Sequence, residues 1–182
     1  NMSENVSDQM VETLAETVRA NYKNIAHRFY RLKAKWLGVD KISYWDRNAP
    51  LPFANDAEYD WAETVSVVLD AYKSFSPELY EIAKDFFDNA WIDVPPRDGK
   101  RSGAFCAPVS AGAHPYLLLN FAGKRNDVLT LAHELGHSLH SYYSNRNNRP
   151  MLAGYQIFVA EVASTVNELL LSHHLLQTSE SP

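Results

Sequence analysis

Three residues in the segment 127–140 have the types and the spacing that metal-dependent hydrolysis requires. His133 and His137 are four residues apart, so in a helix their imidazoles lie one turn above the other, close enough to bind a single metal ion. Glu134 completes a His-Glu-x-x-His pattern and projects to the flank of the histidine face, where its carboxylate could reach water at the metal without being a ligand. The pattern indicates a catalytic zinc site, although histidines on a solvated helix face would look the same.

A third ligand decides between these interpretations, because a catalytic zinc ion has three protein ligands and a fourth position for water. A continuation of the motif through Gly to a third His is excluded, since His140 and Tyr143 occupy those positions. The better candidate is Glu161, in a second apolar helical stretch at 158–168. Glu168 lies seven residues further on, on the same face as Glu161. It could orient a ligand, or it could be a surface carboxylate.

Two further histidines are open to more than one interpretation. His140 is the only nearby candidate for the fourth ligand of a closed structural site, but its position on the same helix makes joint ligation with His137 awkward. His114 stands beside Pro115 in a predicted turn. It could contact a substrate, while a plain turn residue is the simpler interpretation.

Four segments resemble a known family: GKRSGAFC at 99–106, HPYLLLNF at 114–121, TLAHELGHSLH at 130–140 and FVAEVASTVNE at 158–168. They are similar to the catalytic core of the oligoendopeptidase F enzymes, of the thimet-type (M3) family of zinc oligopeptidases. The resemblance implies that His133, His137 and Glu161 are zinc ligands, with one Zn²⁺ per chain, and that Glu134 is the catalytic base. It also implies an oligopeptide substrate that extends along the edge of a sheet before the metal helix.

Enzymes of this family are several times longer than 182 residues, so the chain is expected to be an internal piece or a truncated relative. The family's oxyanion donors, a His and tyrosines, lie well downstream of the second zinc helix, and no residue here matches them. The resemblance therefore predicts a zinc-dependent endopeptidase core whose activity in isolation is low. The alternative is a noncatalytic helical module in which zinc only links two helices.

The composition of the chain limits the classes of partner and the cellular compartment that we expect. With 17 basic and 22 acidic residues the net charge is -5, and nothing in this balance calls for nucleic acid or a membrane surface. No apolar run approaches membrane-spanning length. Cys106 is the only cysteine, which excludes an intrachain disulfide and favours the cytoplasm. We interpret Cys106 as a buried bystander rather than a reactive thiol. The oligomeric state and the preferred peptide are left open.

The predicted fold is α+β and predominantly helical: a zincin-like catalytic core with a small β-sheet before the metal helix. We expect one domain over 1–182, with a helical scaffold at 1–98 and the sheet and zinc-binding helices at 99–178. Apolar residues recur at spacings of three and four between Met10 and Trp36. They predict one long helix that packs into the core and ends at Gly38.

Local signals predict the remaining elements. Asn55 with Glu58 forms a candidate capping box for the next helix. The segments 102–108 and 116–121 are predicted as two strands, each bounded by turn residues. Asn126 is the expected N-cap of the metal helix.

The contact between the two metal helices is also predicted. Gly136 permits the close approach of a neighbouring backbone. On the second helix Glu161 is expected to face away from the packed side, which contains Val162, Val166, Leu169 and Leu170.

Overall fold

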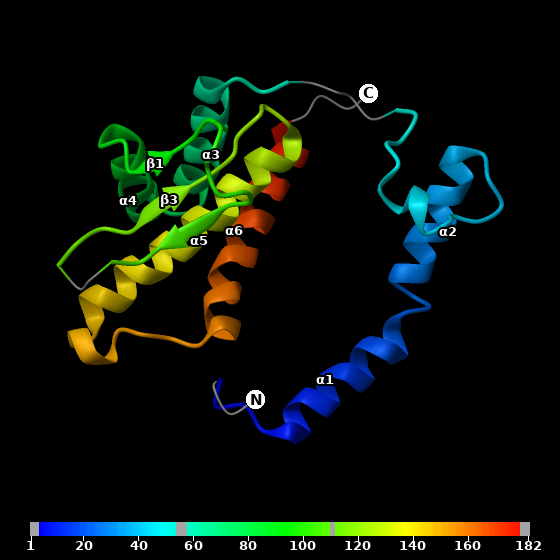
Figure 1. Cartoon of the computed structure of the whole chain (residues 1–182), viewed down its shortest axis with the longest axis horizontal. Helices are drawn as coiled ribbons and strands as arrows, with labels where there is room; N and C mark the ends of the chain where they lie inside the picture. The colour runs from blue at the N-terminus through cyan, green and yellow to red at the C-terminus, as the bar shows by residue number, and fades with distance from the viewer. Residues whose placement is uncertain (1–3, 54–57, 110–111, 179–182) are drawn as a thin grey trace. The chain divides into compact units, whose positions relative to one another are not determined.

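A computed structural model describes residues 4–53, 58–109 and 112–178, in two compact units, 1–56 and 57–182. The predicted α+β fold, mostly helical with a small sheet, is confirmed (Figure 1). The boundary between the units does not coincide with the division expected at residue 98, because the helices of 61–88 pack within the second unit. That the whole chain forms one domain stays a prediction.

The first unit contains α1 (Asp8–Asn21), α2 (Ala26–Leu37) and the short 3-10 helix η1 (Trp45–Asn48). The prediction of one helix from Met10 to Trp36 is wrong. Asn21 ends α1, and its side-chain amide donates to the carbonyl of Thr17 at 2.8 Å, a local hydrogen bond of the kind that competes with helix continuation. The predicted end at Gly38 is confirmed, and Gly38 has a left-handed backbone with φ of 69°.

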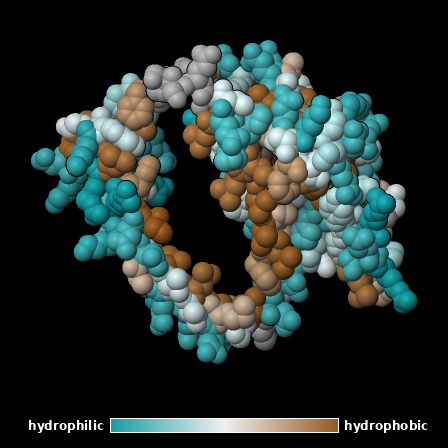
Figure 2. Space-filling model, turned by 180° about the vertical axis from the view of Figure 1, so that it is seen from behind, coloured by the Kyte–Doolittle hydropathy of each residue, from teal (hydrophilic) through white to brown (hydrophobic). Residues whose placement is uncertain are grey.

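The apolar stripe of α1 and α2 does not form a core in the described residues. The exposed fraction of its residues lies between 38% (Trp36) and 69% (Ile25), and Figure 2 shows brown, apolar atoms along these helices. The stripe consists of Met10, Leu14, Val18, Tyr22, Ile25, Phe29, Leu32 and Trp36. The described residues that are buried in α2 are Lys33 and Ala34, and the Lys33 ammonium donates to the carbonyl of Arg47 at 2.8 Å. Within the first unit the stripe forms no core among the described residues, and its packing into a globular core stays a prediction.

The second unit carries the predicted chemistry. Its described elements, in chain order, are α3 (Trp61–Phe75), α4 (Pro77–Asp88), β1 (Ile92–Asp93), β2 (Phe105–Ala107), β3 (Tyr116–Leu118), α5 (Arg125–Asn147), the 3-10 helix η2 (Pro150–Leu152) and α6 (Ile157–Thr178). The two strands expected from the sequence are present, both shorter than predicted. The strand β1 was not predicted, since two residues carry no readable alternation.

The three strands form one sheet in the order β1-β3-β2. The strand β3 is central, parallel to β1 and antiparallel to β2, with Cys106 opposite Leu117 in the register. As a result β2 is an edge strand, and it packs beside α5.

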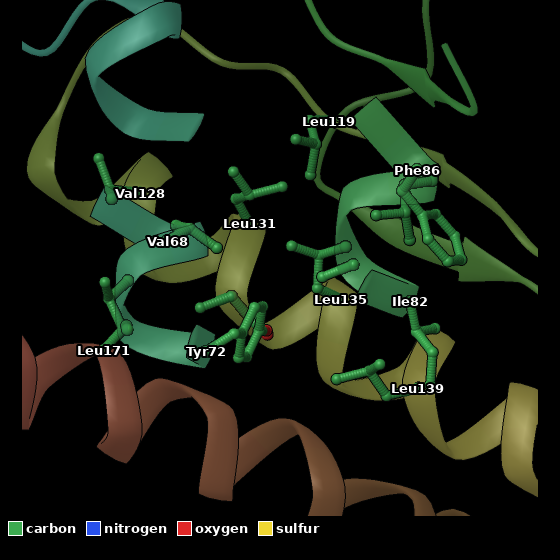
Figure 3. Packing of buried hydrophobic residues seen from close by; sticks show 14 residues of the cluster. Val68, Tyr72, Ile82, Phe86, Leu119, Val128, Leu131, Leu135, Leu139 and Leu171 are labelled. Atoms are coloured by element: carbon green, nitrogen blue, oxygen red, sulfur yellow. The ribbon is translucent and has the colours of Figure 1, made fainter. Parts of the chain in front are cut away.

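The helix α5 crosses the centre of this unit and contributes most to its core. Leu131 and Leu135 have no exposed surface, and burying each such side chain contributes about 1.5–3 kcal/mol relative to an exposed one. Figure 3 shows the cluster that surrounds them: Val68, Tyr72, Ile82, Phe86, Leu119, Val128, Leu139 and Leu171. The core thus fixes α5 from the side that carries no histidine of the motif.

Two helix starts differ from the prediction. The N-cap of α3 is Asp60, which forms a capping box with Glu63, and the predicted Asn55 lies outside the described residues. At the start of α5 the carboxylate of Asp127 accepts hydrogen bonds from the backbone N–H groups of Ala122 (2.9 Å) and Lys124 (3.1 Å). Asn126 lies inside the first turn and is not the cap, because Asp127 satisfies the amides that precede it.

The packed face of α6 also differs from the prediction. Val162, Val166 and Leu169 are 62%, 44% and 64% exposed, so the expectation that they pack is wrong for the described chain. The buried residues of α6 are Ala160, Ser164, Asn167 and Leu171. Near Gly136 the buried side chains of α6 are small or polar, because the backbone of α6 lies very close to α5 there.

Candidate metal centre

The helix α5 places His133 and His137 on one face, as their spacing predicts. Their Nε2 atoms are 3.1 Å apart, and the rings meet edge to face with centroids 4.8 Å apart. Both side chains are partly exposed, in contrast to the opposite side of the helix. Two imidazole nitrogens therefore face one small volume that solvent can reach.

The carboxylate of Glu161 reaches the same volume from α6. Its Oε2 atom is 3.5 Å from His133 Nε2 and 3.8 Å from His137 Nε2, and the Ser164 hydroxyl donates to it at 2.8 Å. The ligand atoms of the three residues all lie within 4.8 Å of one another. Among the described residues this is the one group of His, Cys, Asp and Glu side chains that could hold a metal ion.

Gly136 makes this approach of α6 to α5 feasible. A Cβ atom at this position would lie 2.7 Å from the Ala163 carbonyl oxygen and 2.7 Å from the Ser164 Cα, closer than real Cβ contacts. The predicted role of Gly136 in a close backbone approach is confirmed. The glycine lies directly before His137, so the tightest helix contact adjoins the metal-binding face.

Glu168 resolves one alternative that the sequence left open. Its Oε1 atom is 2.6 Å from Nδ1 of His133, and Glu168 lies about two turns along α6 from Glu161. A carboxylate that accepts the Nδ1 proton fixes the tautomer of the ring and leaves the lone pair on Nε2, which is the atom facing Glu161. This geometry favours the orienting role over that of a plain surface carboxylate.

Glu134 lies outside the three-residue group and is only 6% exposed. Burial raises the pKa of this carboxyl group above its ordinary value, and the nearby Glu161 raises the pKa further. The charge of His133 and a backbone hydrogen bond from Cys106 act in the opposite direction on the pKa. A buried carboxylate with a raised pKa is a stronger base than an exposed one, as proton transfer requires.

Of the other histidines, His137 belongs to the group, while His140 and His114 lie outside it. His137 has a pKa lowered by burial and by the charge of His133, so its neutral, metal-binding form is favoured. His140 stacks on Tyr155 and its buried Nδ1 has no hydrogen-bond partner among the described residues. His114 stacks flat on Trp91, with ring centroids 3.6 Å apart, and bonds to the carbonyl of Pro115 at 3.1 Å, which agrees with a structural turn residue.

Cys106 is half-buried rather than fully buried as expected. Burial raises the pKa of its thiol to about 11, so the reactive thiolate form is disfavoured. What Cys106 contributes to the candidate site is a hydrogen bond from its backbone to Glu134. Nothing in the sequence signals this contact, because it depends on where β2 lies beside α5.

Of two cavities in the described chain, one adjoins the candidate metal site and the other does not. One of about 300 Å³ adjoins the metal-binding group and is lined by Ala104, Asn126, Thr130, His133, Glu134 and Glu168 among others. A larger one, of about 830 Å³, lies in the first unit between α2 and the loop after it, and none of its lining residues belongs to the described metal-binding group. The smaller cavity is the relevant one, since it contains the groups that could do chemistry.

Comparisons with known proteins give the family of the chain. The model of peptidase family M3 matches residues 1–182. Oligopeptidase PepF of Bacillus subtilis is 34% identical over 175 residues, which are 96% of this chain and 26% of that protein. The chromosomal oligoendopeptidase F of Lactococcus lactis subsp. cremoris is 34% identical over 178 residues, 98% of this chain and 29% of that protein.

Solved structures have the same fold. A structure from Chlamydophila abortus is 32% identical with a TM-score of 0.81, and the match covers 98% of this chain and 29% of that one. PZ peptidase A is 23% identical with a TM-score of 0.81, over 94% of this chain and 31% of its own, which shows the fold alone.

The class that these matches define is that of peptidases. The chain belongs to peptidase family M3. It spans between a quarter and a third of the length of these relatives.

Within the described residues, no helix has the length and apolar character needed to cross a membrane.

Proposed function

We propose that this chain is the metal-binding core of a zinc-dependent endopeptidase that hydrolyses peptide bonds in short oligopeptides. The observation that carries the proposal is the meeting of His133, His137 and Glu161 around one volume, with the buried Glu134 beside it. The names of the relatives, oligopeptidase and oligoendopeptidase, favour short peptides as the substrate class. Because the chain spans only part of those proteins, we propose this substrate for a longer protein that contains such a core.

The three side chains fit zinc. A tetrahedral ion with bonds of about 2.0–2.1 Å separates its ligand atoms by about 3.3 Å. The separations here are 3.1, 3.5 and 3.8 Å. The hydrogen bond from His133 Nδ1 to Glu168 also leaves a lone pair on Nε2, which faces another imidazole nitrogen and is suited to a cation between them. Two histidines and one glutamate are a known catalytic ligand set that keeps a fourth position open.

Glu134 is proposed as the general base. When bound, zinc supplies a Lewis acid that polarises the scissile carbonyl and lowers the pKa of water. Glu134 accepts the proton of the attacking water and passes it to the leaving amine, and general acid–base steps of this kind contribute about 100- to 10,000-fold to a rate. The burial that raises its pKa suits both halves of this role.

The edge strand β2 is the proposed support for the peptide backbone. It has β3 on one side only, and Cys106 of β2 has its backbone hydrogen-bonded to Glu134. A peptide that adds to this edge would pass the general base while main-chain hydrogen bonds hold it, with few demands on its side chains.

Metal analysis tests the proposal. We expect about one zinc per chain after the metal-free protein is reloaded and desalted, and a loss of this zinc in His133→Ala and in His137→Ala. His173→Ala is the matched control, because His173 is an exposed histidine of α6 that bonds to Gln177 and lies outside the group. Unchanged zinc in either motif variant would refute the site.

A further inference from the structure

The connection between α5 and α6 is tied back to α5 at a place that the proposed chemistry does not use. The ring of Tyr155 stacks on the ring of His140, with centroids 3.9 Å apart and planes 25° apart. The Tyr155 hydroxyl shares a hydrogen bond of 2.6 Å with the hydroxyl of Ser141. We call His140, Ser141 and Tyr155 the Tyr155 clasp.

The clasp is a built feature rather than a chance surface contact. Ser141 is 2% exposed, and burial raises the pKa of Tyr155, as expected for a phenol removed from water. Next to it the Ser144 hydroxyl donates to the carbonyl of Ala153 at 2.7 Å, so the connection is held to α5 at a second point. His140 has no ligand role in the group of three, and its ring is occupied by the stack.

The clasp stands directly before the first turn of α6. The first hydrogen bonds of that helix run from the N–H groups of Val159 and Ala160 to the carbonyl of Gln156, the residue after Tyr155. Glu161 follows one residue after Ala160. Because a helix is a rigid element with about 1.5 Å of rise per residue, anchoring Tyr155 sets both the height and the rotation of Glu161.

A second anchor lies on the other side of Glu161. There Gly136 admits the backbone of Ala163 and Ser164 against α5. Along α5 the order is Gly136, His137, His140, and along the partner segment it is Ser164, Glu161, Tyr155. His137 and Glu161 therefore lie between two fixed points, the glycine contact and the clasp, while His133 lies on the other side of Gly136.

We propose that His140 and Tyr155 are positioning residues that hold the Glu161 carboxylate at the proposed zinc site. The inference rests on the proposed function, and it adds a role for two residues that bind neither metal nor substrate. Carboxylates and hydrogen-bonding groups that support metal ligands typically change metal affinity by about 10- to 100-fold when they are removed. A clasp that acts through the backbone of α6 belongs at the lower end of this range, about tenfold.

Zinc dissociation constants of the 182-residue chain, measured by chelator competition at fixed pH, test the role. We expect Tyr155→Ala to weaken zinc binding about tenfold, since it removes both the stack and the hydroxyl. Tyr155→Phe and His140→Phe keep two stacked rings and should each stay within about threefold of the unchanged protein. Met151→Ala is the control, because Met151 belongs to the same connection and is 96% exposed.

A double-mutant cycle separates positioning from a general loss of structure. If the clasp acts through Glu161, Tyr155→Ala has no further effect on zinc affinity in a Glu161→Ala background. The affinity of that two-histidine site is read with a weaker competing chelator. Equal losses in both backgrounds, or unaltered affinity in folded Tyr155→Ala protein, would overturn the inference.

The outcome for the clasp is distinct from the outcome for the site. If His133→Ala keeps its zinc, the site itself is wrong and the inference is overturned with it. If His133→Ala loses zinc while Tyr155→Ala binds it as tightly as the unchanged chain, only the clasp is wrong. Circular dichroism of each metal-free variant establishes that the helices are present.

Discussion

The two helices of the candidate site are built differently. The helix α5 is surrounded by the core, with Leu131 and Leu135 fully buried and its apolar and histidine faces separated. The helix α6 turns small and polar side chains toward α5 and leaves Val162 and Leu169 exposed. The two ligands on α5 therefore have their relative geometry set within one helix, while Glu161 depends on how a second, less deeply buried helix is held.

This contrast has a consequence for the metal. A His pair at i and i+4 forms wherever the helix forms. The proposed third ligand, Glu161, joins this pair only if α6 is held at the right height, which we assign to Gly136, Ser164 and the Tyr155 clasp. We therefore expect substitutions on the apolar face of α5 to change global stability, and substitutions that loosen the hold on α6 to change metal affinity.

The largest expected effect compares the two glutamates. Glu134→Gln should keep zinc, because Glu134 is outside the ligand group, and should lower peptide hydrolysis by about 100- to 10,000-fold through loss of the base. Glu161→Gln should instead weaken zinc binding. Metal analysis and mass spectrometry of a cleaved oligopeptide measure the two effects. Equal zinc loss in both variants would mean that the two roles are misassigned.

The next effect compares apolar side chains. Leu131→Ala on α5 should lower the free energy of unfolding by about 2–5 kcal/mol, since it leaves a cavity in a fully buried position. Leu169→Ala on α6 removes the same atoms from a residue that is 64% exposed, and should change stability by less than about 0.5 kcal/mol. Urea denaturation of the metal-free chain measures both. Similar losses would show that the outward face of α6 is covered in solution.

A smaller effect concerns the contact between the helices. Gly136→Ala should cost about 1–3 kcal/mol of stability, because the added Cβ meets backbone atoms of α6 at 2.7 Å. Zinc affinity should fall with it, as α6 is pushed away. Gly154→Ala is the control, since its Cβ would meet nothing within 4 Å. A stable Gly136→Ala protein with unaltered zinc affinity contradicts the close contact.

The smallest effect concerns the support of His133. Glu168→Gln keeps the shape of the side chain but weakens the bond to Nδ1, and should lower zinc affinity about tenfold. Thermal unfolding of the metal-free chain should change little, because Glu168 is partly exposed. A zinc affinity equal to that of the unchanged chain would return Glu168 to the status of a surface carboxylate.

The wrong predictions have physical causes that lie outside periodicity. The apolar residues keep a regular spacing from Met10 to Trp36, but the helix itself is interrupted after Asn21. A hydrogen bond of the Asn21 side chain and a turn end α1 there. Val162, Val166 and Leu169 of α6 were expected to pack because they are apolar, but the backbone of α6 comes so close to Gly136 that small and polar side chains face α5 there. The strand β1 forms by pairing with β3, which no local pattern announces.

From the sequence alone we could predict mainly those features of the site that are set within a single helix. The pairing of His133 with His137 and the flanking place of Glu134 follow from fixed rise and rotation within a helix, and the close approach at Gly136 from its missing side chain, while the fold class came from the segment patterns together with the family resemblance. The meeting of Glu161 with the two histidines was expected from the resemblance, and the tertiary structure brings their atoms together. Tertiary structure alone decided three other contacts: Glu168 with His133 Nδ1, Cys106 with Glu134, and Tyr155 with His140. Such contacts depend on the volumes of all side chains between two backbones, and no spacing along the chain encodes them.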